Sequence, residues 1–285
     1  MIYPSTVKQF LYCAMIQFRS LIIICFFISI HFLQGQSLVL IGGGAWQASN
    51  GGIVTNPTNI NAIYTNPASL SSLDSKWGFD VGVERRFNLS ELSTFSGGGF
   101  FKIDNSVIGA SIVRYGYEDY TEQKIGFTYS RKLFNNFNIG SNFNVLQYRL
   151  NEFGNKTVLS FDIGLLTKIS DNLSIGSVLN NPASSRLLDD RDLPVRISVG
   201  TNYQPSKKVN WIVELEKIID EDLTIKSAIL YYPVESLSLR IGGDFNRNLI
   251  GFGVLYNIQG LNVTGGYSYN SILGNYPSVS LGYQN

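Results

Sequence analysis

Residues 250–258 read IGFGVLYNI, and this short stretch decides the fold class. Ile250, Phe252 and Val254 alternate with two glycines, so large apolar side chains fall on every second position. A period of two predicts a β-strand with one apolar face and one small or polar face. The same phrase, about ten residues followed by a turn, recurs fourteen times from Trp77 onward. The repetition predicts an all-β protein, an antiparallel transmembrane β-barrel of about 14 strands.

The expected strands are long enough to cross a bilayer when tilted, which takes ~9–11 residues. The pattern leaves the strand number open between twelve and fourteen, and residues 106–117 fit either phase. The expected spans are 76–87, 97–104, 106–117, 122–134, 136–149, 156–169, 172–180, 194–204, 208–218, 223–232, 235–245, 248–258, 261–270 and 276–283.

The connections between these strands differ in length on the two sides. They are long after odd-numbered strands and short after even-numbered ones, and only residues 246–247, after the eleventh strand, break the trend. Outer-membrane barrels have long loops on one side and short periplasmic turns on the other. A secreted β-sandwich surface protein is the alternative fold, but a sandwich has no reason to sort its loops by strand parity.

Charged side chains on the polar phase are the candidate lumen residues. Because their signs are mixed, we expect them to pair across the lumen and brace a plug, although they could instead line a polar path. Glu214 and Glu216 are neighbours on one strand, whereas a hydrolase needs two carboxylates across a cleft, so we interpret this pair as structural. The lumen charges are Asp80, Glu84, Arg86, Asp162, Arg196, Glu214, Glu216, Arg240 and Asp244.

The first 36 residues have the pattern of a secretory signal peptide. Residues 21–33 form an apolar run of 13 residues preceded by Arg19, too short for a spanning helix but suited to a signal-peptide core. Cleavage is expected after Gly35 or Gln36, and Met15 is an alternative start. An uncleaved anchor is the rival interpretation, against which Arg19 argues. The leader and the strand pattern together predict the bacterial outer membrane.

Cleavage would remove both cysteines, both methionines and His31, the only histidine. We therefore expect no disulfide, no thiolate or imidazole metal site, no cofactor and no His-assisted catalysis, so the protein is not expected to be an enzyme. Lys8 and Arg19 also leave, so 20 basic residues remain against 21 acidic ones. This near-neutral balance argues against nucleic acid as a partner.

Residues 37–75 do not alternate. They contain a run of three glycines at 42–44 and turn signals at Asn56-Pro57 and Asn66-Pro67, and residues 69–73 suit a short helical turn. We expect this stretch to be a separate N-terminal element, with the barrel at 76–285.

Several phrases resemble a known family in their order along the chain. Residues 44–48 (GAWQA) and 64–70 (YTNPASL) resemble the start of FadL-like outer-membrane proteins. Later phrases are similar to the PorV-like branch of Bacteroidetes-type bacteria, which is associated with type IX secretion. They include LSELS at 89–93, YGYE at 115–118, EQKIG at 122–126, LNNP at 179–182, VELEK at 213–217 and LRIG at 239–242.

The resemblance implies a barrel of about fourteen strands whose N-terminal segment forms a hatch in the lumen. Asn66, Pro67 and Ala68 would then take the role of the hatch motif. FadL relatives move hydrophobic molecules, which implies outer-membrane lipid and a hydrophobic small molecule as partners. PorV relatives act in protein secretion, which implies partners in the secretion machinery. A structural outer-membrane protein without transport is the alternative.

Overall fold

The computed structural model describes residues 43–151, 154–188 and 191–285. The expected signal peptide and residues 37–42 of the expected hatch lie outside the described residues. Among the residues that are described, no helix is both long and apolar enough to span a bilayer.

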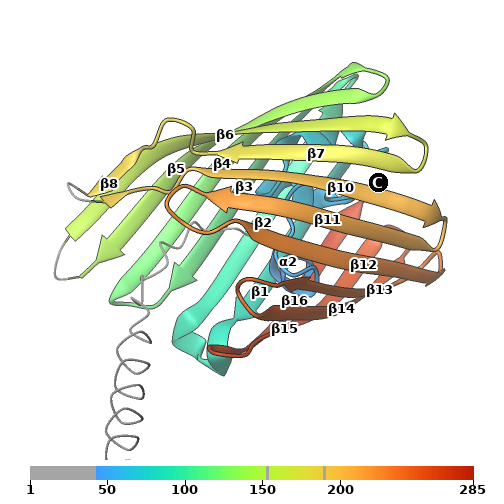
Figure 1. Ribbon diagram of the computed structural model, residues 1–285. Helices are drawn as coiled ribbons and strands as arrows, with labels where there is room; N and C mark the ends of the chain where they lie inside the picture. Colours follow the sequence, from blue (N-terminus) through green and yellow to red (C-terminus); the bar gives the residue numbers. More distant parts are fainter. Residues whose placement is uncertain (1–42, 152–153, 189–190) are drawn as a thin grey trace, which may run out of the picture. The chain divides into compact units, whose positions relative to one another are not determined.

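Fourteen antiparallel strands close into one barrel, in which each strand pairs with its neighbours in the chain and β7 pairs with β10 (Figure 1). The closed ring excludes the β-sandwich alternative and sets the strand number at the upper end of the expected range. The strands are β1 (Trp77–Arg85), β2 (Ser93–Ile103), β3 (Ser106–Gly116), β4 (Tyr120–Phe134), β5 (Phe137–Leu150), β6 (Gly154–Ser170), β7 (Leu173–Asn180), β10 (Arg196–Ser206), β11 (Val209–Ile218), β12 (Thr224–Val234), β13 (Leu237–Asp244), β14 (Leu249–Ile258), β15 (Leu261–Asn270) and β16 (Gly274–Gln284).

Two short strands were not expected from the sequence. β8 (Arg186–Leu188) and β9 (Arg191–Asp192) pair with each other as a separate two-stranded sheet. They lie in the connection between β7 and β10, the longest in the barrel. Their sequence shows no alternation over several residues, so only the folded loop could reveal them.

The connections separate by strand parity without exception. All six connections that follow an even-numbered barrel strand are two-residue turns, as at Asp104-Asn105 and Gln259-Gly260, and every connection that follows an odd-numbered strand is longer. The expected exception after the eleventh strand was wrong, because β13 ends at Asp244 and residues 245–248 form a four-residue loop. The barrel thus has a short-turn side and a long-loop side.

The two faces of the sheet differ as the alternation predicts. Phe252 and Val254 are each 47% exposed on the outer face, whereas Thr264 and Ser268 on the next strand are buried on the inner face. An apolar outer band is the surface that a lipid bilayer requires. The ambiguous strand β3 turns Val107 inward together with Ser111, Val113 and Tyr115, which leaves Ile108 and Ile112 outside.

The first strand is shorter than expected at its end. β1 ends at Arg85, and Arg86–Asn88 form the 3-10 helix η3, in which Phe87 has a positive φ of 54°. The prediction that Arg86 and Phe87 continue the alternation was therefore wrong. The left-handed backbone at Phe87 breaks the period of two. Leu89 then leads into a further 3-10 helix, η4 (Ser90–Leu92).

Residues 43–73, called here the inner segment, fold into three short helices: α2 (Gly44–Ser49), η1 (Ile60–Tyr64) and η2 (Pro67–Ser72). α2 packs against β13–β16 and β1, η1 against β1–β3, and η2 against β4–β6. Contacts to strands all around the ring place this segment in the lumen, and Figure 1 shows α2 (blue) among the strands.

Close backbone contact between the inner segment and the wall requires glycine at inward positions. A Cβ on Gly140 would lie 2.5 Å from the Ala68 nitrogen, and one on Gly242 would lie 2.5 Å from the Asn50 carbonyl carbon. Distances below 3 Å leave no room for a methyl group. The inward glycines of the pattern thus mark where the segment touches the sheet.

We predict that Gly140→Ala destabilises the barrel by ~1–3 kcal/mol, because overpacking moves backbone atoms. Gly265→Ala is the matched control, since a Cβ there meets nothing within 4 Å. The measurement is the temperature at which the detergent-solubilised barrel unfolds. Equal melting of the two variants would contradict close packing of η2 on β5.

Candidate functional site

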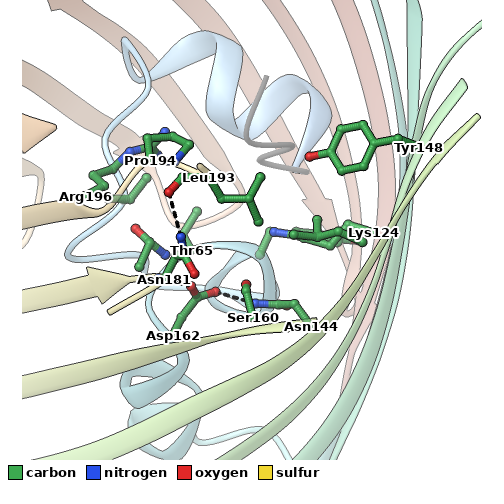
Figure 2. Close-up of a pocket in the computed structure, with 14 residues that line it drawn as sticks. Thr65, Lys124, Asn144, Tyr148, Ser160, Asp162, Asn181, Leu193, Pro194 and Arg196 are labelled. Carbon is green, nitrogen blue, oxygen red and sulfur yellow. Dashed lines mark hydrogen bonds between the residues drawn. The ribbon is translucent and has the colours of Figure 1, made fainter. Parts of the chain in front are cut away.

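A pocket opens within the barrel toward the long-loop side, and it is called here the long-loop pocket (Figure 2). Its cavity volume is about 30 Å³, and about 510 Å³ of space free of atoms is counted when the solvent at its mouth is included. Strands β4–β7, the start of β10 and the inner segment all contribute to its wall. It is lined by Val54, Tyr64, Thr65, Lys124, Asn144, Leu146, Tyr148, Ser160, Asp162, Asn180, Asn181, Leu193, Pro194 and Arg196.

One wall of this pocket is apolar. Leu146, Tyr148 and Val158 form a buried cluster with Leu193 from the connection between β7 and β10. Asn181 fixes that connection, because its side-chain nitrogen donates to the Leu193 carbonyl over 2.8 Å. The polar anchor therefore presses an apolar residue of the loop onto the strands.

Farther from the long loops, the same two strands β5 and β6 carry polar side chains. The Asp162 carboxylate accepts hydrogen bonds from the Asn144 side chain at 2.8 Å and from the Asn181 backbone at 3.3 Å. Lys124 is buried on the neighbouring strand, and Figure 2 shows it beside Leu193 and Tyr148. The pocket thus offers an apolar surface beside a small number of fixed polar groups, as small-molecule sites commonly do.

A second and larger pocket lies toward the short-turn side, and it is called here the short-turn pocket. It encloses about 1480 Å³ of space free of atoms and is open to solvent. Its wall is mainly amide and lysine side chains near the two-residue turns. The lining residues are Asn56, Pro57, Thr58, Ser71, Ser72, Leu73, Asp74, Lys102, Asn105, Lys132, Asn135, Asn136, Asn138, Leu166, Lys168, Ser170, Asp171, Asn172, Leu173, Ser174, Asn202 and Gln204.

The inner segment separates the two pockets. Val54 and Thr65 line the long-loop pocket, whereas Pro57 and Thr58 line the short-turn pocket. Between them the segment fills the lumen with two pieces, Thr55 and residues 66–68, called here the partition.

The partition rests on wall positions that lack large side chains. Backbone or side-chain atoms of Thr55 would lie within 2.2 Å of a Cβ added at Gly176 or Gly200. A Cβ at Gly164 would lie 2.1 Å from Asn66 Oδ1 and 2.9 Å from Pro67 Cδ. These glycines belong to strands that contribute to both pockets, so the partition lies at the height where one pocket ends and the other begins.

Asn66 of the predicted hatch motif joins the two pieces of the partition. Its side-chain nitrogen donates to the Thr55 carbonyl over 2.6 Å and to the Leu165 carbonyl over 3.1 Å. Its side-chain oxygen accepts from the Ala68 backbone at 3.1 Å, which caps η2, and Pro67 follows at the first helical position. The Asn-Pro-Ala sequence therefore starts a helix and fastens it to the loop and the wall.

Charged residues of β10–β13 form a buried cluster, called here the ion network. Lys226 Nζ lies 3.3 Å from Glu214 and 2.7 Å from Glu216. Arg247 lies 2.9 Å from Glu216, and Arg196 lies 3.8 Å from it. Four bridges in one cluster leave the buried Lys226, Glu214 and Glu216 and the half-buried Arg247 each with a partner of opposite sign.

The ion network also reaches the inner segment. Glu214 Oε2 accepts from the backbone nitrogens of Val54 and Thr55, each over 2.8 Å. Lys226 Nζ donates to the Gly52 carbonyl over 3.0 Å. One acid and one base of the wall thus hold Gly52, Val54 and Thr55, the last of which belongs to the partition.

Arg247 closes the ion network on the long-loop side, in the loop between β13 and β14. Burial alone would lower the pKa of its guanidinium, but the Glu216 and Asp244 carboxylates outweigh burial and raise the pKa above its ordinary value. Arg247 also contacts Glu221 at 3.2 Å. The guanidinium therefore stays charged over the whole accessible pH range.

The structure divides the predicted lumen charges into several places. Arg196, Glu214, Glu216 and Asp244 meet in the ion network, and Asp162 lies in the long-loop pocket.

Four other predicted lumen charges lie apart from both. Arg240 stacks on the Trp46 ring at 4.0 Å, Asp80 is buried on β1, and Glu84 pairs with Arg86 at 3.3 Å beyond the end of that strand.

Sequence reasoning missed Lys226, Lys124 and Arg247. Lys226 alternates with Ile225 and Ser227 on a recognised strand, so its inward position could have been inferred from the phase. Lys124 offered the same signal on β4. Arg247 offered none, because its position depends on the loop after β13.

No model of a known protein family matches the sequence, and no curated protein matches it either. Solved structures do match in fold. The toluene transporter TodX of P. putida superposes with a TM-score of 0.67 at 11% identity, covering 86% of this chain and 99% of that chain. A FadL homologue of Pseudomonas aeruginosa gives 0.60 at 12% identity, covering 85% and 99%. The likeness establishes a shared barrel fold.

We predict that Lys226→Ala lowers the free energy of unfolding by about 3–5 kcal/mol, because Glu214 and Glu216 lose a buried counter-charge. Lys168→Ala removes a solvent-exposed pair with Asp171 and should cost only ~0–1 kcal/mol. Chemical denaturation of both variants in lipid vesicles measures the difference. Losses of equal size would show that the ion network is not buried.

Proposed function

We propose that the protein is an outer-membrane barrel that passes small hydrophobic molecules from the long-loop side to the short-turn side. In this proposal residues 1–36 are a signal peptide, residues 37–75 act as the hatch and residues 76–285 form the membrane wall. Asn66, Pro67 and Ala68 serve as the hatch motif by building the partition. The apolar outer band is in contact with outer-membrane lipid.

The apolar cluster of the long-loop pocket is the observation that carries the proposal. Leu146, Tyr148 and Leu193 are buried toward the long-loop end of the lumen, in a barrel whose other inward residues are mostly polar. Stability of the barrel does not require apolar side chains to line a pocket, because a leucine packed against the wall away from the pocket would be equally stable. Their presence at the pocket fits a ligand with apolar surface.

The fold likeness gives the proposal a second support. TodX is named a toluene transporter, and this chain folds into a barrel of the same architecture. The cavity of the long-loop pocket is about 30 Å³, room for roughly one or two water molecules, so we expect side chains of its wall to move when a molecule of the size of toluene binds. Toluene is therefore the first probe to try.

A role in protein secretion is a separate hypothesis. It rests on the order of the PorV-like phrases in the sequence, among them LSELS at 89–93 and VELEK at 213–217. Under this hypothesis the barrel would serve as an outer-membrane partner of the secretion machinery. Deleting the gene should then lower the amount of secreted cargo on the cell surface, and unchanged cargo would rule the role out.

We predict that Leu146→Trp weakens toluene binding to the purified barrel at least tenfold, because the larger ring fills the pocket beside Leu193. Leu159→Trp is the matched control, since Leu159 is 55% exposed on the outer face. Saturation-transfer NMR on the barrel in mild detergent measures binding. Absence of toluene binding in the unchanged protein, or equal binding by both variants, would refute the proposal.

A further inference from the structure

We propose that residues 53–58 are the movable arm of the partition, and that Glu214 is the positioning residue that holds this arm closed. The inference deepens the proposed function and rests on it, since it names how passage between the two pockets is controlled. It concerns one loop and one wall carboxylate of this chain.

The arm is held almost entirely by side chains. Within the described residues, positions 53–58 lie outside every helix and strand and make no hydrogen bond between backbone groups. Glu214 holds Val54 and Thr55, and Asn66 holds the Thr55 carbonyl. The Asn56 side chain donates to the Gly200 carbonyl over 3.0 Å. A segment fixed by side chains is released when those side chains change, without unfolding of any element.

Glu214 makes the strongest of these contacts with the arm. Its side chain is fully buried, and both oxygens are used: Oε2 accepts from Val54 and Thr55, and Oε1 faces Lys226 at 3.3 Å. Hydrogen bonds to an ionised acceptor are about twice as strong as neutral ones. Because Lys226 fixes the direction of the carboxylate, the ion network sets the position of the arm.

A hinge precedes the arm. Gly51 and Gly52 have positive φ values of 65° and 78°, a region that other residues rarely adopt. Two consecutive glycines allow the backbone to rotate at this point. Lys226 donates to the Gly52 carbonyl, so the hinge is bound to the same ion network that contains Glu214.

The other half of the partition is fixed more firmly. Residues 67–72 form η2, the Ser71 backbone donates to Ser130 Oγ over 3.2 Å, and the helix lies on Gly140 without free space. Among the described residues, the hydrogen bond from Asn66 to the Thr55 carbonyl is the one that joins the two halves, apart from chain connectivity. Opening therefore requires displacement of the arm alone.

Displacement of the arm would join the two pockets. Thr55 covers Gly176 and Gly200, which carry no side chains that could close the gap in its place. The long-loop pocket on one side and the short-turn pocket on the other would then form one passage along β7 and β10. The arm is thus the part of the partition whose movement would connect the two sides.

Glu214→Gln tests the hold. In either orientation the new amide group places its NH₂ against a donor, either the Val54 and Thr55 nitrogens or Lys226 Nζ. We expect the open probability of single barrels in a planar bilayer, measured with KCl, to rise at least tenfold. Glu221→Gln is the matched control, because Glu221 contacts Arg247 in the outer loop and does not touch the arm. Unchanged conductance in folded Glu214→Gln protein would overturn the proposal.

A disulfide lock gives the second test. Asn56 and Ser174 have side-chain oxygens 3.4 Å apart, and the sequence after residue 25 contains no cysteine. Asn56→Cys with Ser174→Cys in the Glu214→Gln background should close the barrel when oxidised and reopen it on reduction. If Glu214→Gln does not fold, Asn66→Ala takes its place, since it removes the link to the Thr55 carbonyl. Equal conductance of the oxidised and the reduced protein would contradict an opening at the arm.

The KCl measurement separates this inference from the proposed function. Ion conductance needs no hydrophobic ligand, so gating can respond to Glu214 even if toluene does not bind. In that case the hydrophobic substrate class is wrong and the movable arm stands. If toluene binds but the KCl conductance does not change in Glu214→Gln, the proposed function stands and the movable arm is refuted.

Discussion

A ring of fourteen strands encloses more space than its own inward side chains can fill, and the rest of the structure follows from how that space is occupied. Residues 43–73 occupy much of it. Their backbone lies against the wall at Gly140, Gly176 and Gly242, where any side chain would collide. The small inward residues therefore leave room for the inner segment, and the large apolar outward residues form the surface that contacts the bilayer.

Filling a lumen with irregular chain creates backbone groups that need partners. Glu214 supplies an acceptor for two of the nitrogens, and Asn66 supplies a donor for the Thr55 carbonyl. A buried carboxylate needs a counter-charge in turn, which Lys226 provides. The ion network is thus a consequence of the loop that it holds, and the same contacts that stabilise the closed lumen are the ones that control its opening.

The strands could be predicted from the sequence because alternation is local. The alternation in residues 250–258 predicts both faces of β14 without information from any other part of the chain. The end of β1 could not, because the positive φ at Phe87 depends on the loop that follows. The lumen charges were recognised by phase, but the pairing of Glu216 with Arg247 needed the shape of a distant loop. Thr55 gave no signal at all, because its role exists only where three strands and Asn66 meet it.

The division of the lumen is the central claim, and thiol accessibility tests it most directly. Thr58 is exposed on the short-turn side of the partition, and Tyr117 is 43% exposed in a long-side loop. In proteoliposomes of known orientation, a membrane-impermeant thiol reagent added to the long-loop side should label Tyr117→Cys and leave Thr58→Cys unmodified. Added to the other side, the reagent should label Thr58→Cys. Labelling of Thr58→Cys from the long-loop side in the closed barrel would contradict a divided lumen.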